Sequence, residues 1–82
     1  MTRSRPALRV LAASIAHNEA SKIGRVIERF PAGLVDRIVV VDDASTDETA
    51  KVAAGKGAVI LTHGQRSGGG AAIRTAIRYA MA

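Results

Sequence analysis

Three short, nearly continuous apolar runs divide the chain, and the residues between them follow a different spacing. The runs are rich in Val, Ile, Leu and Ala. Runs of this kind are typical of strands that are buried on both faces, as in parallel sheets. The pattern predicts strands at Leu8–Ala16, Arg37–Asp43 and Ala58–Thr62.

The segment after the first strand has helical periodicity. Its apolar residues lie at i, i+3, i+4 and i+7, on one face of a helix: Ile23, Val26, Ile27 and Phe30. Asn18 is a good N-cap for this helix, and Pro31 and Gly33 are expected to end it.

The second and third helices carry boundary signals of their own. Ser45 with Glu48 three residues later forms a capping box, and Gly55 and Gly57 are expected to end the helix that it starts. A third helix is predicted at Ala71–Met81. Its inward-facing residues are expected to be Ile73, Ala76, Ile77, Ala80 and Met81.

The predicted order is strand, helix, strand, helix, strand, helix. This alternation with right-handed crossovers indicates an α/β fold with a three-stranded parallel sheet of order 3-2-1, the Rossmann-like arrangement. We expect residues 1–6 to be a disordered basic lead and residues 7–82 to form one domain. A domain of 82 residues buries only about 60% of its unfolded surface and is marginally stable alone.

Composition removes several classes of protein. The chain has no cysteine, so disulfides, thiolate metal sites and cysteine nucleophiles are excluded, which fits a reducing, cytoplasmic location. No stretch approaches the roughly 20 apolar residues of a membrane span. The net charge is +5, but a single Tyr and a single Phe provide no stacking platform, so we expect no nucleic-acid partner.

Two adjacent carboxylates follow the second strand. Ligands of open α/β sheets bind outside the carboxyl ends of the strands, and Ser45 is already available to cap the next helix. Because side chains alternate along a strand, Asp42 and Asp43 should point to opposite sides. One of them is therefore expected to meet a ligand, by accepting a hydrogen bond from a base N–H or a ribose hydroxyl.

Polar residues also follow the other two strands. Asn18 and Glu19 suit a helix start, whereas His17 has no such explanation. The glycine-rich stretch at residues 65–70 is expected to be a flexible loop. Backbone N–H groups at a helix start can cradle a phosphate, but the pattern matches neither the Walker motif nor the dinucleotide fingerprint. No residue partners His17 or His63 at metal-ligand spacing.

Three segments resemble the inverting family 2 glycosyltransferases, in order and in spacing. Residues 15–19 (Ile-Ala-His-Asn-Glu) stand where that family has Pro-Ala-Tyr/His-Asn-Glu, and residues 40–47 resemble its Val-Val-Asp-Asp-Gly-Ser-Thr-Asp. Residues 66–70 occupy the place of its Asn-x-Gly-Lys-Gly loop. The branch most similar to this chain is that of the polyprenyl-phosphate (dolichol-phosphate) mannose synthases.

The resemblance implies a GT-A fold that binds a UDP- or GDP-sugar. It places five residues in the nucleotide-sugar site: Ile15, His17, Glu19, Val41 and Asp43. Of these, Asp43 would meet the base or ribose and Val41 would contribute backbone. In the family, a divalent metal (Mg or Mn) neutralises the diphosphate and a carboxylate deprotonates the acceptor, a lipid phosphate or a glycan.

Departures from the family limit what the 82 residues are expected to do. Ile15 replaces a proline, and Arg66 and Gly69 replace the Asn and Lys of the glycine-rich loop. The metal-binding Asp-x-Asp and the catalytic base come later in the family than Ala82. We therefore expect an N-terminal, partial family 2 domain without metal ligands or catalytic residues, which is inactive alone.

Three other interpretations compete with the resemblance. A sugar-nucleotidyltransferase fragment would carry its glycine-rich loop after the first strand, where His17 and Asn18 stand. A receiver-like signalling domain would need an Asp after the third strand, where His63 stands. A small non-enzymatic α/β binding domain remains open. In family 2, the strand after the third helix pairs beside the first strand; without it, Leu8–Ala16 would form an open sheet edge, which predicts self-association.

Overall fold

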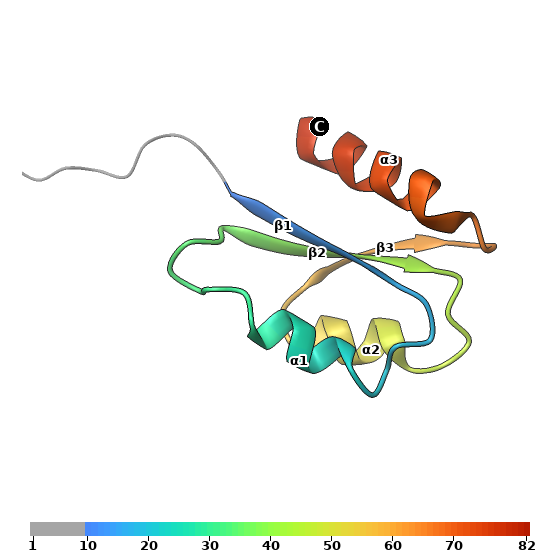
Figure 1. The fold of residues 1–82 in the computed structure, drawn as a ribbon, viewed down its shortest axis with the longest axis horizontal. Coiled ribbons are helices and arrows are strands. Elements are labelled where there is room, and N and C mark those ends of the chain that lie inside the picture. The colour runs from blue at the N-terminus through green and yellow to red at the C-terminus, as the bar shows by residue number, and fades with distance from the viewer. Residues whose placement is uncertain (1–9) are drawn as a thin grey trace, which may run out of the picture.

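The computed structural model describes residues 10–82. In chain order the elements are β1 (Leu11–Ala16), α1 (Ile23–Glu28), β2 (Arg37–Asp43), α2 (Thr49–Gly55), β3 (Val59–His63) and α3 (Gly68–Met81). The lead expected at residues 1–6 and the first residues of the predicted strand at 8–16 lie outside the described part. Within it, the alternation of strands and helices is confirmed (Figure 1).

The three strands form one parallel sheet with β2 in the centre, so the predicted order 3-2-1 is confirmed. Ile15 of β1 pairs with Val41 of β2, and Asp43 at the end of β2 pairs with His63 at the end of β3. This register brings the carboxyl ends of all three strands to the same edge of the sheet.

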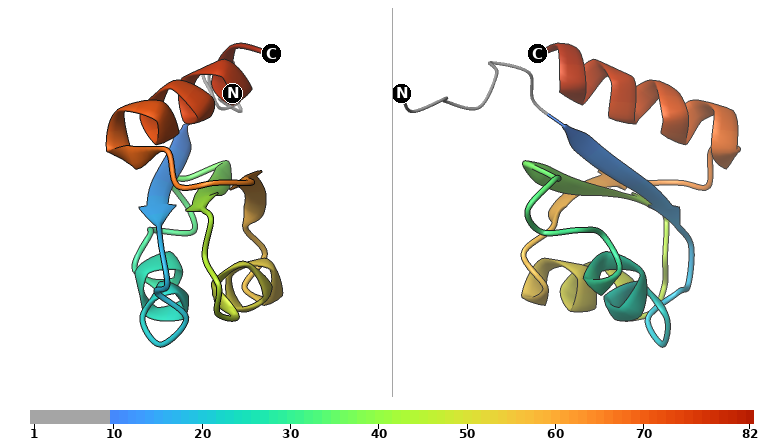
Figure 2. Two further views of the ribbon diagram at one scale, coloured as in Figure 1. Left: turned by 90° about the vertical axis from the view of Figure 1, so that its right-hand side faces the viewer. Right: turned by 60° about the vertical axis from the view of Figure 1, so that its left-hand side comes forward.

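Helices cover both faces of the sheet. Figure 2 shows α1 and α2 together on one side and α3 alone on the other. Because β2 is central and covered on both faces, Val39, Val40 and Val41 are completely buried. Val40 packs in the core toward α1 and α2, whereas Val39 and Val41 pack in the core under α3.

The first strand is shorter than the apolar pattern predicts. Val10 lies outside β1, which begins at Leu11. The N–H of Val10 donates to the carboxylate of Asp36 at 2.6 Å, and its carbonyl accepts from the Asp36 and Arg37 N–H groups. These contacts with the residues that open β2 satisfy the backbone of Val10 without a strand.

The helix starts predicted from caps are wrong for α1 and α2. Asn18 and Ser45 cap neither helix, because α1 begins at Ile23 after Lys22 and α2 begins at Thr49 after Glu48. The two polar side chains bond to each other's loops instead: the Asn18 N–H donates to Ser45 Oγ at 2.9 Å. Tertiary partners have replaced the local ones.

The third helix ends at Met81, as predicted, but differs from its prediction in its start and in its buried face. It begins at Gly68 rather than Ala71, so part of the expected glycine-rich loop is helical. Its buried residues are Ala72 and Ala76, while Ile73 and Ile77 are 53% and 51% exposed. Within residues 10–82 the sheet has three strands with β1 at one edge, and α3 extends past β1, so part of its apolar face covers no strand.

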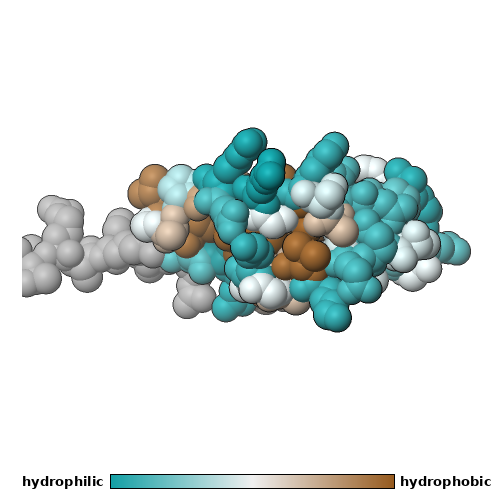
Figure 3. Space-filling model, turned by 90° about the horizontal axis from the view of Figure 1, so that it is seen from below, coloured by the Kyte–Doolittle hydropathy of each residue, from teal (hydrophilic) through white to brown (hydrophobic). Residues whose placement is uncertain are grey.

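The layer of α1 and α2 presents a mostly hydrophilic surface with small hydrophobic patches (Figure 3). Lys56 of the α2 end and Glu28 of α1 form an exposed ion pair at 2.5 Å on this side. Among residues 10–82, no helix is long and apolar enough to cross a membrane.

Candidate functional site

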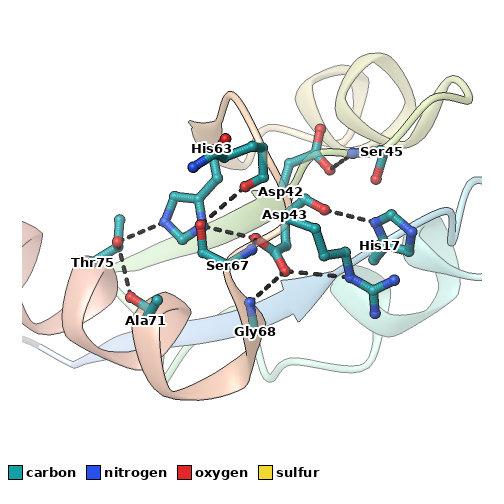
Figure 4. Close-up of polar contacts among 11 residues, drawn as sticks. His17, Asp42, Asp43, Ser45, His63, Ser67, Gly68, Ala71 and Thr75 are labelled. Atoms are coloured by element: carbon teal, nitrogen blue, oxygen red, sulfur yellow. Dashed lines mark hydrogen bonds and ion pairs between the residues drawn. The ribbon is translucent and has the colours of Figure 1, made fainter.

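The paired carboxylates at the end of β2 point to opposite faces of the sheet, as predicted. Asp42 Oδ1 accepts the Ser45 N–H at 3.2 Å, within the loop that leads to α2. Asp43 points to the α3 side, where its partners are His63 and the start of α3 (Figure 4). Both residues are buried, at 4% and 3% exposure. Asp43 is the carboxylate that bridges the three elements at this edge.

Hydrogen bonds fill most of the acceptor positions of Asp43. Its Oδ1 accepts from His63 Nδ1 and from the Ser67 N–H, both at 2.9 Å. Its Oδ2 accepts the Gly68 N–H at 3.0 Å and lies 3.5 Å from Arg66 Nε, which belongs to a largely exposed side chain. The two amides at the start of α3 are therefore taken by a carboxylate of the protein, which leaves them unable to cradle a phosphate.

These contacts hold the pKa of Asp43 well below its ordinary value. The hydrogen bond from His63 is the largest cause, and the Ser67 and Gly68 amides add to it, so that the pKa falls from 3.8 to about 2. Each donor favours the charged form of the carboxylate. Asp43 is therefore ionised at neutral pH and serves only as an acceptor.

A second, partly buried hydrogen bond continues from His63 into α3. Nε2 of His63 lies 2.7 Å from Thr75 Oγ1, and the Thr75 hydroxyl is 3.1 Å from the carbonyl of Ala71, one turn earlier. An Asp-His-Thr series resembles a nucleophilic triad in outline. Thr75, however, lies in the middle of α3, where the backbone N–H groups are bonded within the helix. No oxyanion donor is therefore available beside it.

His17 and Asp43 meet at the edge, as the sequence predicted for residues that follow adjacent strands. Nδ1 of His17 lies 2.6 Å from the backbone carbonyl of Asp43. A carbonyl only accepts, so Nδ1 carries the proton. Nε2 then accepts from the Asn18 amide, 3.4 Å away. The ring is thereby oriented at the end of β1, beside the backbone of the carboxylate.

The turn after β1 is held by the side chains of the motif after β2. We name the contacts between residues 18–20 and 45–49 the loop junction. Ser45 accepts the N–H of Asn18, and Asp47 accepts the N–H of Ala20 at 3.2 Å. Thr49, which is completely buried, accepts the N–H of Glu19 at 2.8 Å. The motif therefore joins two loops, besides ending a strand.

The loop junction reaches the start of α2 through Asp47. Its Oδ1 accepts both the N–H and the hydroxyl of Thr49. The Thr49 hydroxyl is the largest cause that lowers the pKa of Asp47, and the Thr49 and Ala20 amides add to it. Asp47 therefore accepts the first N–H of α2, while Glu48, the N-cap residue, makes no side-chain cap bond.

The other three predicted site residues, Glu19, Ile15 and Val41, differ in how far their side chains are exposed. The carboxylate of Glu19 makes no hydrogen bond or ion pair with any residue between 10 and 82, although its backbone belongs to the loop junction. Ile15 is 43% exposed, while Val41 is completely buried. The backbone of Val41 pairs with β1 and β3, and its contact with a nucleotide stays a prediction.

Two residues at this edge, Ala44 and Gly68, have a backbone with positive φ. Ala44, directly after Asp43, has a φ of 57°, a left-handed conformation that glycine adopts more readily. Gly68 has a φ of 86°, which a residue with a side chain rarely adopts. Because the Gly68 N–H is bound by Asp43, this conformation sets the position of the helix start.

Sequence reasoning missed His63, Thr75 and Thr49 as members of the site. For His63 the sequence did hold an indication, because a parallel register of β2 and β3 places the end of β3 directly beside Asp43. No spacing rule marks Thr75 or Thr49, because their partners lie 12 and 30 residues away along the chain. Only the packed structure brings these groups together.

An open parallel sheet with polar side chains gathered at its carboxyl edge is the arrangement of nucleotide-binding α/β domains. The model of the family described as glycosyl transferase family 2 matches residues 13–82. The chain therefore belongs to glycosyltransferase family 2. An uncharacterized protein of Methanocaldococcus jannaschii is 35% identical over 66 residues, which is 80% of this chain and 27% of that protein.

Two solved structures show the same fold at greater length. Glucosyl-3-phosphoglycerate synthase from Mycobacterium tuberculosis, in complex with Mn²⁺, UDP and glucosyl-3-phosphoglycerate, is 30% identical with a TM-score of 0.66. The match covers 88% of this chain and 34% of that one. A mannosyltransferase from Pyrobaculum calidifontis, in complex with GDP-Man and Mn²⁺, is 27% identical with a TM-score of 0.68 over 90% of this chain and 25% of that one. The 82 residues thus span about a quarter to a third of these relatives.

Proposed function

We propose that the chain supplies the nucleotide-sugar-binding part of a glycosyltransferase. The observation that carries this proposal is the convergence at one sheet edge of His17 after β1, Asp43 after β2 and the glycine-rich start of α3. The membership in family 2, and relatives crystallised with UDP or GDP-Man, support the same class of ligand.

In this proposal each site residue contacts a different part of the nucleotide. One acceptor position of Asp43 Oδ2 faces the guanidinium of Arg66, whose side chain is 66% exposed. A base N–H or a ribose hydroxyl can take this position when Arg66 moves aside. Glu19 offers an unpaired carboxylate for a ribose hydroxyl, and Ile15 offers an exposed apolar surface for a base.

The divalent metal that we expect for the full-length enzyme would be held by residues other than 10–82. Among residues 10–82, no group of three His, Cys, Asp or Glu side chains could hold a metal ion. Asp43, moreover, already has its oxygens in hydrogen bonds. The described residues do not fit a metal, so we expect this chain to bind and orient the nucleotide without transferring the sugar.

For the whole enzyme, we propose an acceptor that carries a phosphate, with a polyprenyl phosphate as the first choice. The likeness of the three segments to the polyprenyl-phosphate mannose synthases supports this choice. The Mycobacterium relative was crystallised with phosphoglyceric acid, which shares the phosphate and lacks the lipid. Because the chain has no cysteine, we retain a reducing, cytoplasmic location as part of the proposal.

We also propose that isolated copies of the chain associate through β1. The outer side of β1 and the overhanging face of α3 form an apolar groove of about 260 Å³, which we name the β1–α3 groove. Its lining includes Ile15, Ile73 and Ile77. A second copy offers the same strand edge and the same apolar residues, so a two-fold contact would pair two backbones and cover both grooves.

Titration with nucleotides tests the proposed function directly. UDP and GDP, each with and without MnCl₂, are added to the purified 82-residue chain while backbone amide signals are followed by NMR. We expect shifts at His17, Asp43 and Ser67, and no shift at Leu34, which is exposed far from this edge. Unchanged spectra with both nucleotides would contradict the proposal.

A further inference from the structure

His63 is a partly buried histidine that no motif explains. Its side chain is 14% exposed and lies between β2 and α3. One ring nitrogen contacts Asp43 Oδ1 at 2.9 Å and the other contacts Thr75 Oγ1 at 2.7 Å. Both polar atoms of the ring are therefore engaged inside the protein, and the ring has no nitrogen left for a ligand.

The partners of His63 determine which way its hydrogen bonds run. Asp43 is ionised and only accepts, so Nδ1 of His63 must carry a proton. When the ring is neutral, Nε2 accepts from the Thr75 hydroxyl. When the ring is charged, Nε2 donates to Thr75, whose hydroxyl then turns to the carbonyl of Ala71, 3.1 Å away. In either protonation state, both nitrogens keep a partner and the ring keeps its orientation.

This ring contributes to the position of the Asp43 carboxylate. A carboxylate offers about four acceptor positions. His63 and the Ser67 amide occupy the two positions on Oδ1, and the Gly68 amide occupies one on Oδ2. One position on Oδ2 remains, opposite Arg66 Nε. His63 is the only side chain, within residues 10–82, that hydrogen-bonds to this carboxylate.

We propose that His63 is a positioning residue for nucleotide recognition. His63 donates to Asp43 and is held by its hydrogen bond with Thr75. It thereby keeps the carboxylate in the rotamer that also binds the two amides of the glycine-rich helix start. The single open acceptor on Oδ2 is thereby aimed at the carboxyl edge of the sheet. This inference rests on the proposed function for the identity of the ligand, but not for the arrangement of the loop.

Two variants of His63 separate positioning from simple packing. His63→Asn keeps an amide donor near the place of Nδ1, whereas His63→Leu keeps bulk and removes the donor. In His63→Leu we expect the pKa of Asp43 to rise from about 2 toward 3.8, because its strongest donor is gone. We expect the amide signals of Ser67 and Gly68 to move, and UDP and GDP binding to weaken about tenfold, the loss of one charge-assisted hydrogen bond.

His63→Asn is expected to keep the loop signals and to bind within about threefold of the original chain, since the donor to a charged acceptor is retained. Equal losses in both variants, or an unchanged Asp43 pKa in His63→Leu, would overturn the inference. If neither UDP nor GDP binds the original chain, the proposed function fails, while the Asp43 pKa and the loop amides still decide the role of His63.

A third measurement needs no variant and so does not depend on whether His63→Leu folds. The ¹⁵N chemical shifts of the His63 ring in the original chain report which nitrogen carries the proton. We expect the neutral ring to be protonated at Nδ1, with Nε2 accepting from Thr75. A neutral ring protonated at Nε2 would contradict the donation to Asp43 and with it the inference. Thr75→Ser should keep this tautomer, since the hydroxyl remains.

Discussion

At the carboxyl edge of the sheet, side-chain oxygens accept backbone N–H groups from loops that are far apart in the sequence. Asp43 binds the start of α3, and Thr49 and Asp47 bind the turn after β1. Along the outer side of β1, by contrast, apolar side chains of α3 lie half-exposed over an open strand edge. In the first region, polar groups find their hydrogen-bond partners within the chain. In the second region, apolar side chains stay exposed and could be covered by another molecule.

The difference shows how the same pattern of apolar positions can lead to two outcomes. Ile73 and Ala76 both fit the apolar face of α3, yet Ile73 is 53% exposed and Ala76 only 8%. Their burial depends on how far the sheet extends beneath the helix. Polar contacts at the carboxyl edge depend instead on the register of β2 with its two neighbours.

Replacing Asp43 by Asn should have the largest effect, because one carboxylate joins three elements. The variant keeps the size of the side chain and loses its charge. We expect nucleotide binding to weaken by at least about tenfold, measured by the NMR titration, and the Ser67 and Gly68 amides to exchange faster with solvent. Asp42→Asn, on the opposite face of the sheet, is the matched control and should leave both amides protected.

The same variant tests the pH dependence of stability. The pKa of Asp43 in the folded chain, about 2, is lower than its ordinary 3.8. Its ionised form therefore stabilises the fold fully above pH 3.8, and this contribution is lost as the pH falls toward 2. Urea unfolding across this range should fall more steeply in the original chain than in Asp43→Asn. Parallel curves would show that Asp43 does not contribute.

Thr49→Val should break the loop junction at a buried point. The valine matches the shape of Thr49 but leaves the Glu19 N–H without its acceptor. An unsatisfied buried N–H costs about 1–3 kcal/mol, so the midpoint of urea unfolding should fall accordingly. Thr49→Ser keeps the hydroxyl and should lose less. A Val variant as stable as the Ser variant would mean that water replaces the lost acceptor.

Ile73→Glu tests the β1–α3 groove. A charge in the β1–α3 groove should weaken association of two copies by about tenfold, since covering one such side chain is worth about 1–2 kcal/mol. Sedimentation at several protein concentrations measures the change. Leu34→Glu is the control, because Leu34 is 68% exposed outside the groove. A chain that stays monomeric at high concentration before any substitution would refute self-association.

Ala44→Gly should have the smallest effect and the opposite sign. A left-handed conformation costs an L-residue roughly 1–2 kcal/mol, part of which is offset by the extra freedom of glycine in the unfolded chain. We expect a gain of about 0.5 kcal/mol in the free energy of unfolding, seen as a higher urea midpoint. Gly68→Ala, at a φ of 86°, should lose stability. A loss in both would indicate that Ala44 contributes packing.

The apolar pattern alone determined the order of strands and helices and the parallel topology, because both follow from spacing and from the handedness of crossovers. It also determined that Asp42 and Asp43 face opposite sides and that His17 meets Asp43, since adjacent parallel strands end at one edge. These properties depend on local periodicity and chain connection, which the sequence carries directly.

Tertiary structure decided the caps, the start of α3 and the His63–Thr75 link. Asn18 and Ser45 have strong capping preferences, but each found a partner in the other's loop. Gly68–Gly70 became helical because a carboxylate from β2 satisfies the first amides of the helix. Such contacts join groups 12 to 28 residues apart, and a hydrogen bond of that span exists only once the sheet has set the distance between its ends.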